Sequence, residues 1–281
     1  MKLVRYGNAG SERPGIIDGD GAIRDLGGVI GEIDGQALAP GKLSEIARLN
    51  LTTLPLVEGA VRLGPCVARP GKFLCIGLNY ADHAAETGAA IPSEPVVFMK
   101  ATSAVCGPND PVIQPRGSTK LDWEVELAFV VGTECRYCDE SAAAAAIAGY
   151  FICNDVSERA FQFERGGQWD KGKGCDSFGP IGPWLVTADE VGNAGDLSMW
   201  LDVNGRRFQQ GSTRTMIFKP AFVLSYLSQF MSLQPGDIVT TGTPPGVGLG
   251  QKPPRYLQVG DEMRLGIEGL GEQRQSVVAW V

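Results

Sequence analysis

An alternation of acidic and apolar residues marks the segment 121–127, whose order is Leu121, Asp122, Trp123, Glu124, Val125, Glu126 and Leu127. Such a period of two predicts a β-strand, and the apolar run that follows, up to Gly132, extends it. Side chains two apart on a strand point to the same face, so the three acids would share one face and the apolar residues the other. Any fold for this chain must therefore accommodate three neighbouring carboxylates.

The shared face of the three acids has two interpretations. Neighbouring carboxylates repel each other, and burying them without partners costs free energy. Either the face is open to water, as on a solvated edge strand, or a cation lies among the carboxylates. Oxygen-preferring ions such as Mg²⁺, Mn²⁺ or Ca²⁺ are the natural candidates for such a site. On this segment alone, the solvated edge strand is the simpler interpretation.

Length and composition limit the classes of protein. The chain has 281 residues, enough for one large domain or for one domain with a small companion. Its net charge of −7 argues against nucleic acid or an anionic membrane as the main partner. A small anionic substrate would need local positive charge, from a metal or from a few basic side chains. Residues Met1–Tyr6 resemble a strand rather than a secretory signal, and the apolar stretch 142–153 is too short to span a bilayer, so a cytoplasmic location is expected.

Seven cysteines and a single histidine limit the metal and redox chemistry. An odd number of cysteines in a long chain without a secretory signal predicts reduced thiols. Only Cys135 and Cys138 have a paired spacing, and a zinc site would need a second pair or histidines nearby. The lone His83 excludes a multi-histidine metal site, and any histidine acid–base chemistry would have to use it.

The order of segments predicts a small first unit, residues 1–70, and a larger second unit, residues 71–281. The first has short strands and a helix at 40–50 but no convergent chemistry, so a packing or dimerisation role is expected. In the second, turn-forming residues occupy 178–184, and an amphipathic helix is expected at 220–230. The residues expected on its buried side are Phe222, Val223, Tyr226, Leu227 and Phe230.

Several further groups lie where predicted strands end, which is where binding and catalytic side chains are often found. One buried-type strand ends at Lys100 and another at Asp155. His83 and Glu86 are three apart on a predicted helix, so they would be neighbours there. A carboxylate in that position orients an imidazole and raises its basicity, although a surface His–Glu pair has the same spacing.

The second unit also offers positive charge and an anion-binding loop. A helix expected from Ser157 to residue 165 places Arg159 and Gln162 on one side. Lys173 lies in a glycine-flanked loop, and the loop 240–248 has the amides and hydroxyls that suit an anion. Together, these parts supply hard-metal ligands, a base and an electrophilic cation. They predict an enzyme with metal-assisted chemistry next to a carbonyl.

Five motifs, taken in order, are similar to those of the fumarylacetoacetate hydrolase family. They are Ile76–Glu86, Glu124–Glu126, Asn154–Ser157, Lys171–Asp176 and Thr241–Gly248. Their order and spacing agree over residues 72–281, and residues 1–70 more weakly resemble the small N-terminal domain of the bacterial members. The resemblance implies a β-rich α+β fold, a mixed β-sandwich roll with a small N-terminal α+β domain, assembled as a homodimer or homotetramer.

The resemblance also implies roles for individual residues. Mg²⁺, with Mn²⁺ or Ca²⁺ as alternatives, would bind Glu124, Glu126 and Asp155, and Asp122 would not be a direct ligand. The catalytic groups would be His83, Glu86 and Lys173. The residues expected to contact substrate are Arg159, Gln162, Lys100 and Thr243.

In the implied reaction, a 2,4-diketo acid (an acylpyruvate) binds the metal through its carboxylate and 2-keto oxygens. His83, oriented by Glu86, takes a proton from water, and the resulting hydroxide attacks the C4 carbonyl. The C3–C4 bond then breaks, and the metal and Lys173 stabilise the departing pyruvate enolate. The products are pyruvate and a carboxylic acid.

The substrate has several candidates. A bacterial subgroup with this combination of motifs includes hydrolases of 2,4-diketo-3-deoxy sugar acids, such as 2,4-diketo-3-deoxy-L-rhamnonate, and proteins labelled ureidoglycolate lyase. We expect a sugar-acid hydrolase, with ureidoglycolate lyase or oxaloacetate decarboxylase as alternatives. Two alternatives of other classes are a non-catalytic metal-binding protein and a structural oligomer whose acidic strand is merely solvated.

Overall fold

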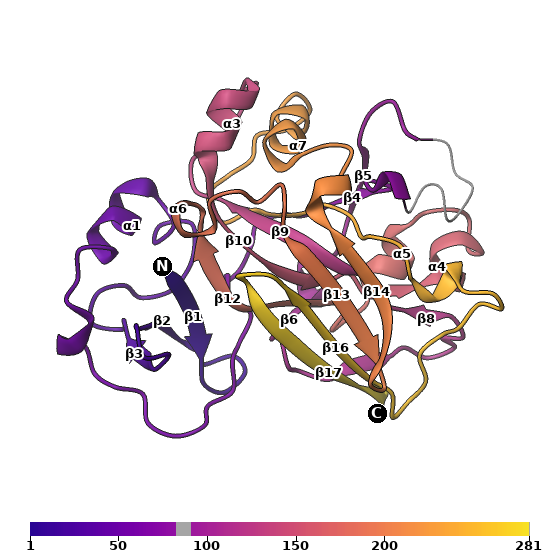
Figure 1. Ribbon diagram of the computed structural model, residues 1–281, viewed down its shortest axis with the longest axis horizontal. Helices are drawn as coiled ribbons and strands as arrows, with labels where there is room; N and C mark the ends of the chain where they lie inside the picture. The colour runs from indigo at the N-terminus through magenta and orange to yellow at the C-terminus, as the bar shows by residue number, and fades with distance from the viewer. Residues whose placement is uncertain (83–90, 281) are drawn as a thin grey trace.

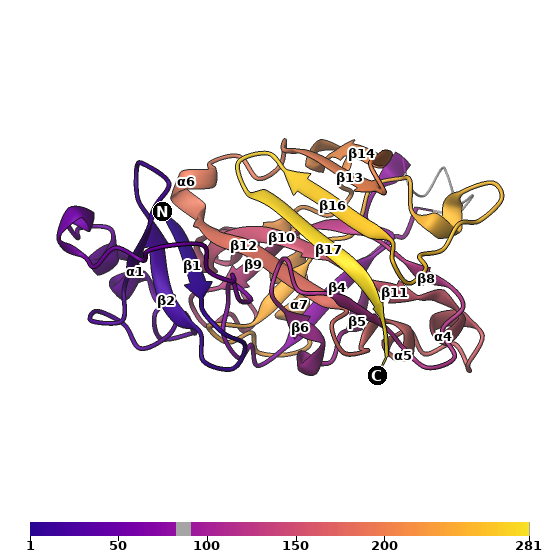
Figure 2. The same ribbon diagram turned by 90° about the horizontal axis from the view of Figure 1, so that it is seen from below.

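The computed structural model describes residues 1–82 and 91–280, and the described part is built mainly from β-sheet (Figure 1 and Figure 2). The largest sheet has ten strands, and one path of neighbours runs through all but one of them. Along that path lie β3 (Ile23–Asp25), β2 (Arg13–Ile17), β1 (Lys2–Tyr6), β12 (Gly179–Thr187), β10 (Ile147–Asn154), β9 (Val125–Val131), β15 (Ile238–Thr240), β4 (Phe73–Gly77) and β5 (Val96–Met99). The remaining strand, β6 (Val105–Cys106), pairs with β12.

A five-stranded sheet packs against the large one, and a two-stranded ribbon lies beside them. The five strands are, in order, β14 (Arg206–Ser212), β13 (Ser198–Val203), β16 (Glu262–Ile267), β17 (Gly271–Ala279) and β7 (Val112–Gln114). The ribbon pairs β8 (Leu121–Asp122) with β11 (Ser157–Glu158). Most pairs are antiparallel, but β4 with β15, β6 with β12, and β7 with β17 are parallel. The expected β-rich α+β fold with mixed sheets is confirmed.

The helices are short and lie around the sheets. They are α1 (Pro40–Ile46), α3 (Glu140–Ala146), α4 (Arg159–Phe163), α5 (Asp170–Lys173), α6 (Ala188–Val191) and α7 (Pro220–Leu227). Single 3-10 turns occur at Leu51–Thr53, Thr102–Ala104, Thr213–Thr215 and Gly248–Gly250. In Figure 1, α3 and α7 lie together along one edge of the molecule, and α4 and α5 lie together at another.

Strand β9 lies in the middle of the large sheet, between β10 and β15. Its Val125 and Leu127 enter the core shared with the five-stranded sheet, and Phe129, on the same face, packs under α3 and α7. Ala128, on the opposite face, enters the core that includes the N-terminal strands. Every residue of β9 is buried. The solvated edge strand is therefore wrong as an interpretation, and the acids of this segment need partners inside the protein.

The N-terminal strands extend the large sheet. Strand β1 pairs antiparallel with β12, with Lys2 opposite Val186 and Leu3 opposite Leu185. Arg62, also in the N-terminal part of the chain, forms an ion pair with Asp110, with 2.5 Å between Nη2 and Oδ2. In Figure 1 this part of the chain, in indigo and purple, lies on one side of the molecule. The division of the chain at residue 70 stays a prediction.

Helix α7 differs in orientation from the expected amphipathic helix. It buries Val223, Leu224 and Leu227, whereas Phe222 is 38% exposed and Phe230 is 64% exposed. Aliphatic and aromatic residues are both hydrophobic, so periodicity alone could not decide which of them faces the sheet. The aromatic rings instead contact one another along the outside of the helix, with Phe222 stacked on Tyr226 at 6.4 Å.

Residues 178–184, expected as turns, mostly form the start of β12. Prolines lack the amide that a sheet ladder requires, but they are tolerated at bulges. The pairing of β10 with β12 shifts register between Tyr150 and Ile152, and Pro183 lies opposite this irregularity. The bulge therefore lets a proline-containing segment run through the interior of a sheet.

The helix expected to begin at Ser157 begins two residues later, at Arg159. Ser157 and Glu158 pair with β8 instead, since they continue the ladder that β9 and β10 began. The Glu158 carboxylate then caps α4 by accepting a hydrogen bond from the amide of Ala160 at 3.0 Å.

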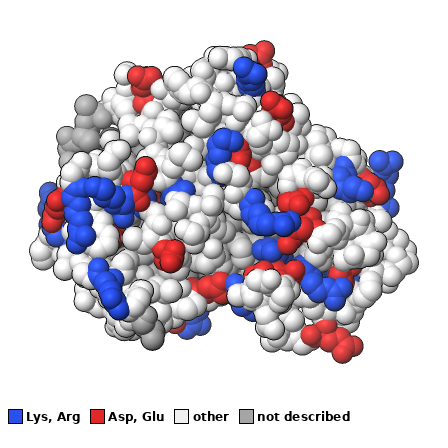
Figure 3. All heavy atoms as spheres, turned by 180° about the vertical axis from the view of Figure 1, so that it is seen from behind, with Lys and Arg blue, Asp and Glu red and all other residues white. Residues whose placement is uncertain are grey.

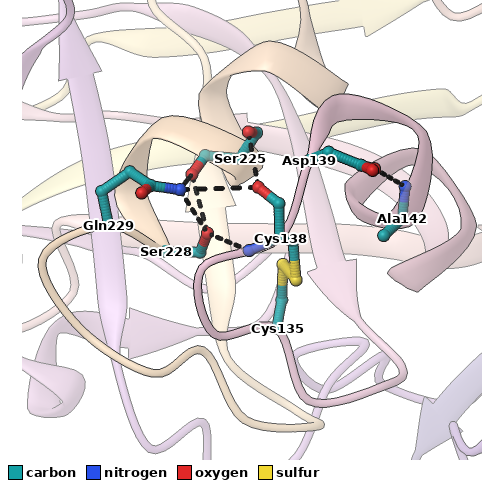
Figure 4. The surroundings of a disulfide bond; sticks show 7 residues. All are labelled: Cys135, Cys138, Asp139, Ala142, Ser225, Ser228 and Gln229. Atoms are coloured by element: carbon teal, nitrogen blue, oxygen red, sulfur yellow. Dashed lines mark hydrogen bonds between the residues drawn. A yellow bond between two sulfur atoms is a disulfide. The ribbon is translucent and has the colours of Figure 1, made fainter.

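Cys135 and Cys138 are joined in a disulfide, so the expectation of reduced thiols is wrong for this pair (Figure 4). The loop that carries them precedes α3 and lies against α7. There, the Cys138 amide donates to Ser228 Oγ at 3.0 Å, and Ser225 Oγ donates to the Cys138 carbonyl at 2.8 Å. The cysteines not joined in this bond are Cys66, Cys75, Cys106, Cys153 and Cys175.

The outer surface carries charges of both signs. On the face seen in Figure 3, acidic and basic side chains are intermingled. Among the described residues, no helix is long and apolar enough to cross a membrane.

Replacing Trp123 by alanine should lower the free energy of unfolding by about 3–5 kcal/mol, because it removes a large ring from a closed core. Trp123 is fully buried, contacts Phe208 edge-to-face at 5.0 Å and donates from Nε1 to the carbonyl of Gly246 at 3.1 Å. Denaturant unfolding measures the loss. Trp280, which is 49% exposed, is the matched control, and its replacement should cost about 1 kcal/mol or less. Equal losses at the two positions would contradict this account of the core.

Candidate metal centre

The pairing of β9 with β10 brings together acids that are some thirty residues apart in the chain. Glu126 lies opposite Cys153. Two residues earlier on β9, the Glu124 carbonyl accepts a hydrogen bond from the amide of Asp155 at 2.9 Å. Opposed residues in an antiparallel pair share a face, and so do residues two apart along a strand. Glu124, Glu126 and Asp155 therefore converge on one face, where β10 ends.

These three carboxylates form a site that fits a hard divalent cation. One oxygen atom from each lies within 4.8 Å of the others. All three side chains are buried, with no residue more than 6% exposed. Carboxylate oxygens are the donors that Mg²⁺, Mn²⁺ and Ca²⁺ prefer, so the donor set fits each of these ions.

Asp122 lies outside this triad and holds neighbouring segments in place. Its Oδ1 accepts a hydrogen bond from the Gly248 amide at 2.6 Å, and its Oδ2 accepts one from the Leu249 amide at 3.0 Å. Arg159 Nε also donates to Oδ2, at 2.8 Å. The carboxylate of Asp122 therefore fastens the loop after β15 to the segment that carries the triad.

Three buried cations are bonded to the candidate ligands. Lys173 Nζ donates to Glu124 Oε2 at 2.7 Å and to Asp155 Oδ2 at 2.8 Å. Arg159 Nη2 donates to Glu124 Oε1 at 2.5 Å, and Lys100 Nζ donates to Asp155 Oδ1 at 2.5 Å. Lys173 is the last residue of the short helix α5, not part of the loop that its glycine neighbours suggested.

The two glutamates of the triad have opposite pKa shifts. Burial would raise the pKa of Glu124, but the charges of Arg159 and Lys173 outweigh it and lower the value to about 2. Burial raises the pKa of Glu126 well above its usual range, and the charges of Asp155 and Glu124 raise it further. Burial would lower the pKa of Lys173, but Asp155 and Glu124 outweigh it and raise the value. The carboxylates bonded to Lys173 thus favour its charged form, whereas the surroundings of Glu126 favour its protonated form.

Buried basic side chains compensate the carboxylates around the candidate metal site. Asp122, Glu124 and Asp155 form ion pairs with Lys100, Lys173 and Arg159. A divalent cation held by Glu124, Glu126 and Asp155 would add positive charge to this cluster. That charge would favour the binding of an anionic substrate.

A cavity of about 260 Å³ is lined by two members of the triad, Glu124 and Glu126, and Asp155 lies outside its lining. The residues expected from the sequence that line it are Glu124, Glu126, Lys173, Arg159, Gln162 and Thr243. Lys100, expected to contact substrate, lies outside this lining. Its side chain is completely buried behind Asp155, and Nζ also donates to the Val156 carbonyl at 3.0 Å. Its position makes it a partner of a candidate metal ligand rather than a substrate contact. His83 and Glu86 lie outside the described residues.

Two buried side-chain amides, those of Asn154 and Gln209, support the backbone of the site, and sequence analysis assigned a role to neither. The ladder is interrupted between β8 and β9, so the amides of Glu124 and Val125 need other acceptors. Asn154 Oδ1 accepts from the Glu124 amide at 3.1 Å, and Gln209 Oε1 accepts from the Val125 amide at 3.0 Å. Asn154 belongs to the motif that contains Asp155, but no pattern in the sequence singles out Gln209, which reaches the site from the other sheet.

Comparison with known proteins relates this arrangement to a family of enzymes. Residues 72–278 match the family model described as fumarylacetoacetate (FAA) hydrolase C-terminal. A relative from Burkholderia multivorans is 59% identical over 276 residues, which cover 98% of both chains. The name of that relative is provisional and gives it as a hydrolase with no substrate.

Solved structures show the same fold. The fumarylacetoacetate hydrolase from the psychrophile Exiguobacterium antarcticum is 34% identical, with a TM-score of 0.86 and 100% of each chain covered. A maleylpyruvate hydrolase from Sphingobium sp. SYK-6 is 30% identical, with a TM-score of 0.82 over 100% of both chains.

Replacing Glu126 by glutamine should abolish stabilisation by Mg²⁺ without destabilising the metal-free protein, because an amide resembles the protonated carboxyl in shape. In the wild type, Mg²⁺ at about one hundred times its Kd adds about 2.7 kcal/mol, or roughly 5–10 °C in Tm for a domain of this size. The shift is read from thermal unfolding with and without Mg²⁺. Glu272→Gln, at an exposed ion pair with Arg264, is the control and should keep the shift.

The stabilities of the metal-free wild type and of Glu126→Gln should depend differently on pH. The pKa of Glu126 is higher in the folded protein than in the unfolded chain, so the metal-free wild type binds more protons when folded. Its stability therefore falls as pH rises from the unfolded value, about 4.3, towards the folded value. Glu126→Gln should lack this contribution. A wild-type Mg²⁺ shift in the variant would remove Glu126 from the metal site.

Proposed function

The chain belongs to the fumarylacetoacetate hydrolase family, and on that premise we propose that it is a divalent-metal-dependent hydrolase of 2,4-diketo acids. It would cleave the C3–C4 bond and release pyruvate and a carboxylic acid. The observation that carries the proposal is the buried triad of Glu124, Glu126 and Asp155, with Lys173 bonded to two of its members, beside a cavity that Glu124, Glu126 and Lys173 line.

The reaction balances with water as the only second reactant. The water oxygen forms a bond to C4 and loses one proton to a base. The C3–C4 bond breaks, its electron pair stays on C3 as the enolate of pyruvate, and a proton then converts that enolate to pyruvate. A bound divalent cation supplies positive charge that stabilises the enolate.

Lys173 supports this reaction as a fixed positive charge. Its raised pKa keeps the ammonium protonated, so it does not act as the base. Held between Glu124 and Asp155, and lining the cavity, it lies next to the place where the enolate oxygen would develop charge. We propose His83, oriented by Glu86, as the base that takes the proton from water. Arg159, Gln162 and Thr243 are proposed to position the substrate.

The substituent on C4 separates the candidate substrates. Motif resemblance favours a 2,4-diketo-3-deoxy sugar acid, with ureidoglycolate lyase and oxaloacetate decarboxylase as alternative activities. Mg²⁺ is the proposed ion, with Mn²⁺ or Ca²⁺ as alternatives, and a homodimer or homotetramer is the proposed assembly. These alternatives differ in their products: ureidoglycolate yields no pyruvate, and oxaloacetate yields carbon dioxide with it.

Pyruvate should be released from acylpyruvates only when a divalent metal is present. A coupled lactate dehydrogenase assay across acylpyruvates, a diketo-deoxy sugar acid and oxaloacetate measures it. Chelation by EDTA should abolish the rate, and added Mg²⁺ should restore it. No pyruvate from any acylpyruvate with Mg²⁺ or Mn²⁺, in a protein that binds the metal, would favour a non-catalytic binding protein instead.

Replacing His83 by alanine should lower kcat about 10²–10⁴-fold, which is the usual contribution of a general base. The Mg²⁺-induced rise in Tm should remain, because His83 is not among the proposed metal ligands. Steady-state kinetics and thermal unfolding of the same preparation separate the two effects. Turnover at the wild-type rate would exclude His83 as the base.

A further inference from the structure

The cavity beside the triad has two chemically different walls. One carries the charged and polar groups of the metal centre. The other is apolar and is formed by Phe98, Phe163 and Trp169, whose rings are in contact, and Leu78, Val247 and Leu249 add further apolar lining to the cavity. An apolar wall next to a cluster of charges is where the non-reacting part of a substrate can bind by burial.

Trp169 is the centre of the apolar wall. Its ring contacts Phe98 edge-to-face at 5.4 Å and Phe163 at 5.8 Å. Gly77, at the end of β4, leaves room for the ring, because a Cβ atom there would lie 2.7 Å from Trp169. The indole is therefore fitted into a space that a glycine keeps open, and it is not a loose surface side chain.

The apolar wall adjoins the reacting centre through one turn of chain. The Trp169 carbonyl accepts hydrogen bonds from the amides of Gly172 at 2.9 Å and Lys173 at 3.1 Å. The ammonium of Lys173 lies 5.1 Å from the centre of the Phe98 ring. A substrate held at the triad would thus extend its C4 substituent along this aromatic wall.

Most of the described polar side chains of the lining are already bonded to one another or to the metal centre. Arg159 and Lys173 are bonded to carboxylates of the metal centre. Thr243 Oγ1 donates to the Val125 carbonyl at 2.9 Å and accepts from Gln209 Nε2 at 2.8 Å, and Gln162 Oε1 accepts from Arg159 at 3.1 Å. A polyhydroxylated or carboxylated substituent would lose its water there without equivalent hydrogen bonds.

We infer that the wall around Trp169 is a subsite for the C4 substituent and that it selects an apolar, preferably aromatic, acyl group. The inference rests on the proposed hydrolysis of acylpyruvates and replaces the sugar acid as the preferred substrate class. Space agrees with it, because a cavity of roughly 150 Å³ holds a benzene ring. The observed cavity, about 260 Å³, leaves room for the 2-oxo acid as well.

Matched acylpyruvates test the subsite. With Mg²⁺, kcat/KM for benzoylpyruvate should exceed that for acetylpyruvate at least about tenfold, since burying a phenyl group contributes roughly 1.5–3 kcal/mol. The same ratio for fumarylpyruvate and for a diketo-deoxy sugar acid should stay near or below one. Cleavage of acetylpyruvate with a preference for either polar substrate would overturn the subsite and leave the proposed hydrolase intact.

Variants of the wall connect the preference to Trp169. Trp169→Ala should reduce the ratio of kcat/KM for benzoylpyruvate to that for acetylpyruvate about tenfold, and Trp169→Phe, which keeps an aromatic ring at this position, should reduce it less. Phe222→Ala removes an exposed aromatic side chain from α7, outside the cavity lining, and should leave the ratio within about twofold. An unchanged ratio in both Trp169 variants would overturn the assignment.

Binding gives a readout that does not need turnover. The uncleavable pair 2-oxo-4-phenylbutanoate and 2-oxopentanoate can be compared by isothermal titration calorimetry in the presence of Mg²⁺. The phenyl compound should bind at least about tenfold more tightly to the wild type and less than threefold more tightly to Trp169→Ala. If no acylpyruvate is cleaved, this result still stands for the subsite while the proposed function fails. Equal binding of the two compounds overturns the subsite whatever the kinetics show.

Discussion

The candidate metal site depends on ion pairs between the buried carboxylates near β9 and buried basic side chains. One of these carboxylates lacks such a pair among the described residues. A carboxylate in the interior costs several kcal/mol unless a cation compensates it. Asp122, Glu124 and Asp155 each bond to a buried lysine or arginine. In the described part of the chain, no ion pair includes Glu126, which accepts a hydrogen bond from the Gly242 amide at 2.9 Å. That one carboxyl without an ion-pair partner makes the cluster a candidate cation site rather than a closed set of salt bridges.

The strand pairing that positions Glu126 also contains an irregularity next to the candidate metal site. The register that sets Glu126 opposite Cys153 continues to the pair Asp122 and Ser157, on the far side of an interruption. In the interruption, Glu124 uses Asn154 in place of a strand neighbour. Strand pairing is interrupted here, between β8 and β9. The interruption lies where three acids, two lysines and an arginine meet beside the cavity.

Local pattern predicted the strands but could not predict their surroundings. The alternation of apolar and acidic residues predicted the strand that ends at Val131, but an edge strand and a central strand can have the same alternation. The difference lies in the two neighbours of β9, which are β10, the next strand of the chain, and β15, which comes from more than one hundred residues later. Local pattern could not predict the triad either, because only pairing across the sheet brings Asp155 to Glu124. The resemblance of the motifs to the family predicted that both residues bind the same metal. Trp169 carried no signal, since its position depends on the space at Gly77.

One close contact positions both walls of the cavity. A Cβ atom on Gly172 would lie 2.5 Å from the Glu158 carbonyl and 2.6 Å from the Gln162 amide, so only glycine lets α5 approach α4 this closely. The turn that makes this approach carries Trp169 at one end and Lys173 at the other. The glycines around the lysine therefore serve packing rather than a flexible cradle. Because one rigid turn holds the fixed charge and the apolar ring, a substituent that fits the ring also places its carbonyl next to the charge.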